Sequence, residues 1–165
     1  MRTLIYKRTH RGDPDTEGRF GIHDCMGRVR EWSFDAVIGV GGIGVKPESQ
    51  GLARKVNWVG IGSHKRAVAG KPGLIVTFDH FLLFESDGPS FPELAPNLAN
   101  RMYSKNVRLL IDDLDPVECA EVENILALAK DTPPSPTGHF GRGIPSKKCV
   151  PRTPSIIKSV KGCSN

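Results

Sequence analysis

The sequence predicts an α/β fold: a single layered domain with a mainly parallel or mixed sheet of about five strands, two to three helices and an irregular C-terminal tail. Three observations predict it. Apolar runs of strand length lie at 35–40, 56–61 and 107–111 and show no polar alternation, as in strands covered on both faces. One helix-start pattern lies between the second and third of these runs, and another follows the third. The length of 165 residues fits one domain.

The remaining strands and the first loop are predicted as follows. Arg2–Arg8 is rich in strand-forming residues and is expected to be the first strand. Thr9–Ile22 holds three Gly, one Pro and two Asp, which indicates a long loop. The run Leu74–Phe84 is a long strand interrupted by Asp79 and His80. If its side chains alternate, these two face opposite sides, and one is a polar group in a core layer that needs a hydrogen-bond partner.

Helices are indicated at three places by their start signals. Asp24 is a suitable N-cap for a short helix over Cys25–Trp32. Ser90 and Glu93 form a capping-box pattern, but Pro96 would clash with a continuous helix, so a turn is expected there and a helix over 96–103. The run Asp115-Pro116-Val117-Glu118 is a strong start for a helix that ends near Lys130.

Charge divides the chain into a globular domain over 1–130 and a tail over 131–165. Net charge is +6 over residues 1–72 and −6 over 73–130, whereas the last 35 residues carry +5 and six of the 13 prolines. Such a segment has too few large apolar residues to offset its ordering entropy. We expect a flexible or loosely docked tail, either a solvated terminus or a basic arm for a polyanion.

Composition excludes some classes of protein. No apolar stretch approaches the roughly 20 residues that span a bilayer, and the N-terminus lacks a signal-peptide pattern, so a cytoplasmic protein without membrane contact is expected. The cysteines show no zinc-ligand spacing, and disulfides are rare in cytoplasmic proteins, so we expect neither a zinc site nor a disulfide framework. Cys119 falls in a predicted helix and is expected to be a small buried residue.

Glycines and basic residues follow two of the predicted strands, where ligands bind in open α/β sheets. The first group fits G-x-G-x-x-G in form and comprises Gly39, Gly41, Gly42 and Gly44. Since Val45–Gly51 is a poor helix start, a full dinucleotide-binding fold is disfavoured. The alternatives are a tight strand exit and a backbone cradle for phosphate. The second group is a better anion site, or an ordinary basic loop, and comprises Gly62, Ser63, His64, Lys65 and Arg66.

Acids, histidines and one cysteine complete the candidate site. The loop after the first strand brings His10, Arg11, Asp13 and Asp15 within six residues. Its two carboxylates suit either a divalent metal ion or acid/base chemistry, although the same residues also form turns. Cys25 at a helix N-terminus is a candidate nucleophile or a buried residue. Asp79 and His80 are candidate catalytic groups or members of a structural network.

These residues predict an enzyme that binds a phosphorylated, nucleotide-like ligand or nucleic acid and performs hydrolysis or group transfer. The candidate catalytic residues are Asp13, His10, Asp79, His80 and Cys25. The alternative is a non-catalytic module that binds nucleic acid or another protein, with a dimer as one form. The enzyme hypothesis requires the segments at 9–15, 39–44 and 60–66 to share one rim of the sheet.

Overall fold

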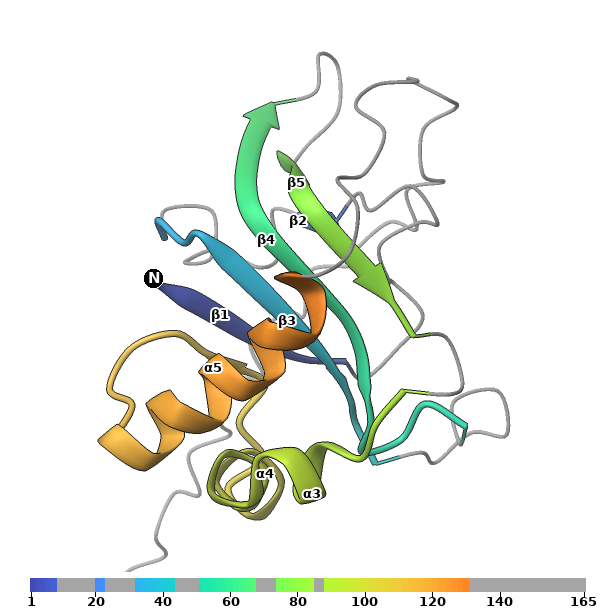
Figure 1. The fold of residues 1–165 in the computed structure, drawn as a ribbon, viewed down its shortest axis with the longest axis vertical. Coiled ribbons are helices and arrows are strands. Elements are labelled where there is room, and N and C mark those ends of the chain that lie inside the picture. The colour runs from blue at the N-terminus through green and yellow to red at the C-terminus, as the bar shows by residue number, and fades with distance from the viewer. Residues whose placement is uncertain (9–19, 23–31, 44–50, 68–73, 85–87, 131–165) are drawn as a thin grey trace, which may run out of the picture.

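The computed structural model describes residues 1–8, 20–22, 32–43, 51–67, 74–84 and 88–130 (Figure 1). Its elements, in chain order, are β1 (Thr3–Arg8), β2 (Phe20–Ile22), β3 (Ala36–Gly41), β4 (Val56–Ala67), β5 (Leu74–Leu83), α3 (Phe91–Leu94), α4 (Pro96–Ser104), β6 (Leu109–Leu110) and α5 (Pro116–Lys130). The predicted tail and the predicted helix over 25–32 lie outside the described residues.

The six strands form one mixed sheet in the order β2-β5-β4-β3-β1-β6. Among the strands of the described residues, only β1 and β3 run parallel, and every other neighbouring pair is antiparallel. The α/β class and the mixed sheet are confirmed, but a mainly parallel sheet is not what forms. Six residues separate β4 from β5, and a parallel pair needs a crossover of a dozen or more.

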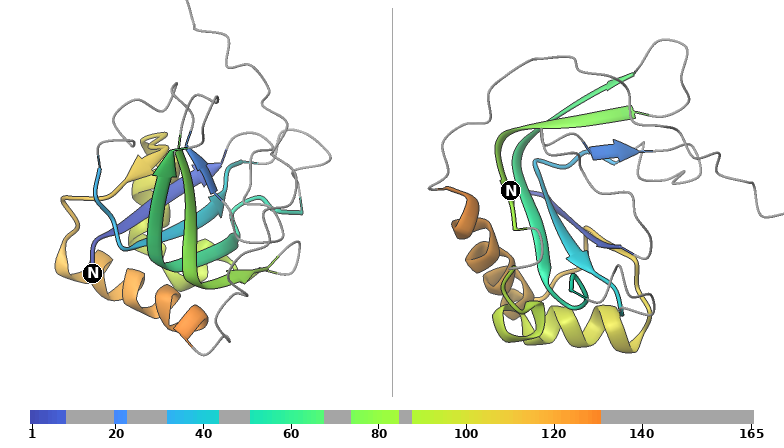
Figure 2. Two further views of the ribbon diagram at one scale, coloured as in Figure 1. Left: turned by 90° about the horizontal axis from the view of Figure 1, so that it is seen from above. Right: turned by 90° about the vertical axis from the view of Figure 1, so that its right-hand side faces the viewer.

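The sheet is strongly curved, and its two faces carry separate apolar clusters. Figure 2 shows β4 and β5 bending away from the helices, which lie on the outer face of the bend. The outer cluster joins Ile5, Ile38 and Val59 to α3, α4 and α5. The inner cluster contains Leu4, Phe34, Val37, Trp58, Val76, Phe78 and Ile111. Both faces of β3 are therefore buried, which explains why its sequence lacks alternation.

The helices begin where the sequence predicts, but their caps differ. In α5, the Glu118 N–H donates to Asp115 Oδ1 at 2.8 Å and the Asp115 N–H donates to Glu118 Oε2 at 3.1 Å, which confirms the start signal. Ser90 makes no side-chain cap and instead bridges to Lys55. The N-terminus of α4 is capped from α5, because Glu121 Oε2 accepts from the Leu98 N–H at 2.9 Å.

The exposure of Cys119 in α5 differs from the sequence expectation. Cys119 is exposed, so the prediction of a buried thiol is wrong. Its thiol contacts the Leu114 carbonyl, with 3.9 Å between sulfur and oxygen, whereas Val122, Ile125 and Ala129 belong to the outer cluster. No helix among the described residues is long and apolar enough to cross a bilayer.

A buried lysine and a tyrosine connect the parallel pair of strands to α4. Lys7 is 4% exposed, and its ammonium donates to the Met102 carbonyl at 2.7 Å, at the C-terminal end of α4. The Tyr103 hydroxyl donates to the Gly41 carbonyl at 2.6 Å. Burial lowers the pKa of Lys7. Burial raises the pKa of Tyr103 to about 12, although Arg54 acts in the opposite direction.

The raised pKa of Tyr103 predicts a loss of stability at alkaline pH. Its pKa is about 10 in the unfolded chain and about 12 in the folded protein. The stabilisation is therefore complete below pH ~10 and is lost as the pH rises toward ~12. Tyr103→Phe is expected to reduce the unfolding free energy by about 1 kcal/mol at pH 8 and to weaken its alkaline decline. Urea unfolding at pH 8, 10 and 11 measures both effects, and an equally steep decline in the variant would contradict them.

Candidate functional site: a histidine–aspartate pair on the bend of the sheet

His64 and Asp79 meet across β4 and β5 although 15 residues separate them. His64 Nε2 lies 2.7 Å from Asp79 Oδ1, and the two side chains are 66% and 56% exposed. Since a carboxylate can only accept, the contact with the neutral imidazole requires the Nε2–H tautomer. Nδ1 then presents its lone pair, and no contact to it is found among the described residues. This is the arrangement of a histidine base oriented by an acid.

Gly62 provides the space for this pair. It has a φ of +71°, and a Cβ at this position would overlap the Asp79 carboxylate. The ladder pairs Ile61 with His80 and Ser63 with Phe78, so Gly62 and Asp79 stand opposite one another between them. The absence of a side chain at Gly62 lets the carboxylate cross β4 toward His64.

A break in side-chain alternation places both Asp79 and His80 away from the inner cluster. Phe78 and Phe81 both belong to the inner face and stack with ring centroids 6.1 Å apart. Because a strictly alternating strand would put residues three apart on opposite faces, β5 changes its alternation between them. Asp79 is exposed and His80 half-buried. The expectation that one of them is buried in a core layer is therefore wrong.

The basic segment predicted as a loop is the second half of β4. The strand continues to Ala67, so Gly62 to Arg66 pair with β5 rather than follow a strand end. Ser63 and Lys65 turn to the inner face, where Ser63 donates to the Phe34 carbonyl and Lys65 to the Trp32 carbonyl. The Lys65 ammonium also lies 4.0 Å from the centre of the Phe34 ring. Burial lowers its pKa, and Arg2 adds to this effect.

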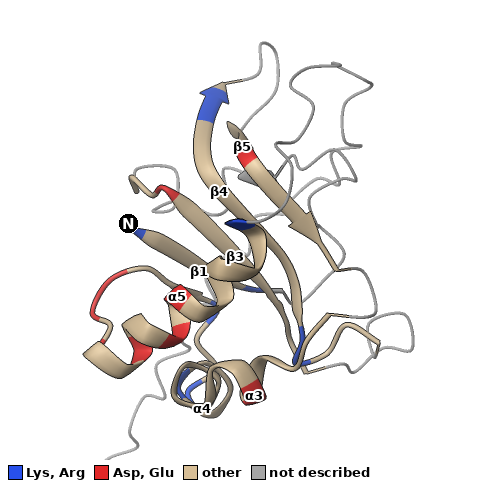
Figure 3. Cartoon of the chain, in the orientation of Figure 1, with Lys and Arg blue, Asp and Glu red and all other residues tan. Residues whose placement is uncertain are grey.

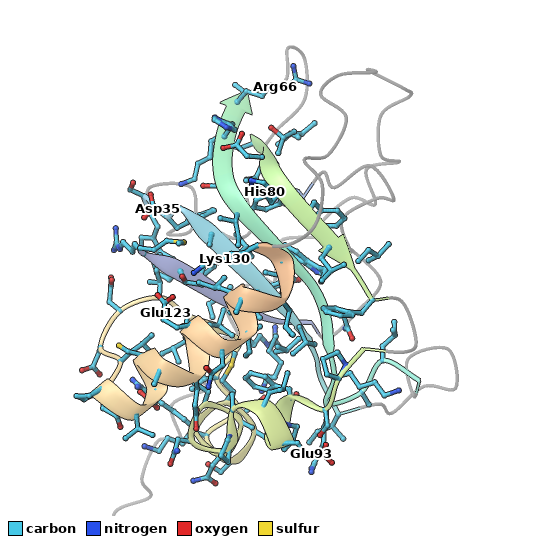
Figure 4. The ribbon with its side chains drawn as sticks, viewed as in Figure 1. Asp35, Arg66, His80, Glu93, Glu123 and Lys130 are labelled. Carbon is cyan, nitrogen blue, oxygen red and sulfur yellow. The ribbon has the colours of Figure 1, made fainter. Side chains whose placement is uncertain are left out.

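Alternation along β4 puts His64 and Arg66 together on the face opposite Ser63 and Lys65. Figure 4 shows Arg66 at the far end of β4 and His80 further down, on β5, where it pairs with Ile61. The structure thus brings together His64 and Asp79, with Arg66 on the same side. Ser63 and Lys65 are directed away from this group.

The glycines of β3 are explained by packing and pairing. Gly39 and Gly41 lie inside β3, not after it. A Cβ on Gly39 would overlap the Trp58 indole, and one on Gly41 would overlap the Leu52 carbonyl. The Gly41 N–H donates to the Lys55 carbonyl at 2.9 Å, and the Gly42 carbonyl accepts from the Arg54 N–H at 3.2 Å. The Gly41 N–H is thus engaged within the protein and does not serve a phosphate.

The segments 39–44 and 60–66 do not lie at the same edge of the sheet. β3 and β4 are antiparallel, with Ala36 opposite Ile61 and Val40 opposite Val56. The carboxyl end of β3 therefore lies beside the start of β4, and residues 62–66 lie at the other end. The expectation of a site built jointly from 39–44 and 60–66 is wrong, because it assumed parallel strands.

Several predicted site residues lie outside the described part of the chain: His10, Arg11, Asp13, Asp15, Cys25 and Gly44. The metal site predicted at Asp13 and Asp15 falls among them. Within the described ranges, no three His, Cys, Asp or Glu side chains form a group that could hold a metal ion.

Sequence reasoning named both members of the pair but did not join them. The available signal was the position of polar residues within two neighbouring apolar strands, since a short connection predicts a hairpin and hence cross-strand contacts. No family model, curated protein or solved structure matches this chain. The functional argument therefore rests on the residues described above.

Proposed function

We propose that this protein is an enzyme that hydrolyses a phosphate ester in a nucleotide-like ligand, with His64 as general base. The observation that carries the proposal is the 2.7 Å contact between His64 Nε2 and Asp79 Oδ1. It orients the imidazole and favours the tautomer in which Nδ1 can accept a proton. Arg66, two residues further along β4, supplies the fork of donors that suits a phosphate group.

The proposed reaction has balanced proton and bond changes. His64 Nδ1 takes a proton from a water molecule while the water oxygen forms a bond to phosphorus. The bond between phosphorus and the leaving oxygen breaks, and that oxygen receives a proton from the His64 imidazolium, which restores the neutral base. Asp79 stabilises the imidazolium while it carries the extra proton, and Arg66 holds the non-bridging oxygens as their charge changes.

The test measures hydrolysis by the full chain of p-nitrophenyl phosphate, bis(p-nitrophenyl) phosphate and a panel of nucleoside phosphates. His64→Gln is expected to lower kcat about 10²–10⁴-fold, because residue 64 can then no longer accept the proton of the attacking water molecule. Asp79→Asn is expected to lower kcat with little change in KM. Residue 79 then no longer favours the His64 tautomer in which Nδ1 can accept a proton. The matched control is Glu93→Gln, which removes an exposed acid from α3, at the opposite end of the molecule from Arg66 (Figure 4).

Two results would overturn the proposal: full activity in His64→Gln, or no turnover of any of these compounds by the unaltered chain. The second result combined with salt-sensitive binding of nucleic acid would favour the alternative, a non-catalytic binding module.

A further inference from the structure

Lys7 is a buried cation whose partners are neutral. It is 4% exposed, and its ammonium donates to the Met102 carbonyl at 2.7 Å and to Asn106 Oδ1 at 3.3 Å. An ammonium has three N–H donors, so these contacts leave one donor without an acceptor among the described residues. Buried charges in proteins are as a rule paired with an opposite charge. A negative charge beside Lys7 would therefore stabilise it strongly.

Arg54 and Arg108 add positive charge around Lys7. The Lys7 ammonium and the Arg54 guanidinium lie 5.4 and 5.3 Å from the centre of the same Tyr103 ring. The Lys7 N–H donates to the Arg108 carbonyl at 2.8 Å, and the charge of Arg108 adds to burial in lowering the Lys7 pKa. Both arginines are exposed and stay charged at any ordinary pH. We call Lys7, Arg54 and Arg108 the basic cluster.

No described acid forms an ion pair with the basic cluster. Glu93 lies exposed in the first turn of α3 and makes no ion pair with these cations. Figure 3 shows that acidic residues gather on α5 and on the connection before it. The remaining described acids bind Arg2, Arg101, Lys130, His64 or a helix N-terminus, and they are Asp35, Asp79, Asp112, Asp113, Asp115, Glu118, Glu121 and Glu123. The charge of the basic cluster is thus not balanced by any described carboxylate.

The basic cluster lies at the carboxyl end of the parallel pair β1 and β3. Lys7 pairs with Val40 near the end of both strands, and Val40 pairs with Val56 at the start of β4. Ligands of open α/β sheets bind beyond the carboxyl ends of parallel strands. The cluster is separate from the His64–Asp79 pair, because His64 lies roughly 25 Å further along β4 than Val56 at about 3.3 Å per residue.

We propose that the basic cluster binds a phosphate group, at a site distinct from the His64–Asp79 pair. The two guanidinium groups present N–H forks that match phosphate oxygens, and the remaining Lys7 donor adds a contact from the buried side. A phosphate dianion would balance the two arginines and favour the protonated form of Lys7. Because the arginines are exposed, the site suits inorganic phosphate or the phosphate end of a larger molecule. The proposal does not rest on the proposed function, since it uses no residue of that site.

The experiment measures binding of inorganic phosphate to the full chain by isothermal titration calorimetry at constant ionic strength. Arg54→Gln and Arg108→Gln are each expected to raise Kd about tenfold or more, the effect of losing a hydrogen bond to a charged group. Both arginines are exposed, so the two variants are expected to fold. The buried contact is tested without a substitution, by NMR of the Lys7 side chain. Saturation with phosphate is expected to raise the Lys7 pKa, because a nearby anion favours the charged form.

Two control substitutions isolate this site. Lys130→Gln removes the same charge from an exposed lysine that lies 3.7 Å from Glu123, and it is expected to leave Kd unchanged. Arg66→Gln removes the cation nearest in sequence to His64 on the same face of β4. An unchanged Kd in this variant shows that phosphate is not held beside the His64–Asp79 pair.

The outcomes decide the proposal separately from the proposed function. Saturable binding that both arginine variants weaken and both controls leave unchanged supports it. A nucleoside monophosphate that binds more tightly than phosphate, and is weakened by the same variants, supports it and identifies a phosphorylated molecule as the ligand. Absence of saturable binding, equal weakening by either control, or an unchanged Lys7 pKa at saturation overturns it. The kcat of phosphate-ester hydrolysis tests the proposed function in each case.

Discussion

Gly39→Ala is expected to destabilise the protein by about 3 kcal/mol or more, at or above the upper end for overpacking a core. A Cβ at this position would overlap the Trp58 indole. The indole has no free direction in which to move, since Trp58 is 1% exposed and its ring centroid lies 5.8 Å from that of Phe78 and 6.0 Å from that of Phe81. Such a loss is a large part of the 5–15 kcal/mol typical of a domain.

Urea and thermal unfolding, followed by tryptophan fluorescence and circular dichroism, measure the effect. The control is the double variant Gly39→Ala with Trp58→Leu, in which the smaller side chain leaves space for the new methyl group. The loss of unfolding free energy in the double variant is expected to be smaller than the sum of the losses in the two single variants. If Gly39→Ala had the same melting temperature as the unaltered chain, the prediction would be contradicted. β3 and β4 could then move apart with no loss of unfolding free energy.

Gly62→Ala is expected to abolish the His64–Asp79 contact while the fold persists. Alanine at a φ of +71° costs about 1–2 kcal/mol, which lowers the melting temperature by several degrees. The new methyl group would overlap the Asp79 carboxylate, which is exposed and can turn away into solvent. If the proposed function is correct, kcat falls to the level of Asp79→Asn and KM changes little.

The matched control for Gly62→Ala is Gly60→Ala. This glycine is two residues away on β4, and its Cβ would come within 2.5 Å of the Phe78 ring on the inner face. Gly60→Ala is expected to be destabilised but to keep its kcat when assayed at a temperature where it is folded. In an Asp79→Ala background, Gly62→Ala should lower only stability. A further fall in kcat there would show that Gly62 acts through something other than Asp79.

The helices could be predicted from the sequence because their signals are local. Pro116 and the reciprocal bonds of Asp115 and Glu118 define the start of α5 within four residues. Pro96 likewise separates α3 from α4. Neither signal depends on any contact with the rest of the chain.

The second half of β4 could not be predicted in this way. Its sequence from Gly62 to Arg66 is polar and contains glycine, which is typical of a loop. It becomes a strand because His64 and Lys65 find partners in Thr77 and Val76 of β5. The contact between His64 and Asp79 could not be predicted for the same reason: it needs the space left by Gly62 opposite Asp79, and no window of either strand alone contains both residues.

The position of β1 between β3 and β6 has a consequence for the order of folding. Ile5 pairs with Leu110, and the Arg2 guanidinium bonds Asp112 at 2.6 Å, across more than a hundred residues. On a ribosome, the first strand is made long before its outer neighbour. During synthesis, one backbone edge of β1 therefore remains open to other chains until β6 emerges. The high sequence separation of this closure also favours slow folding.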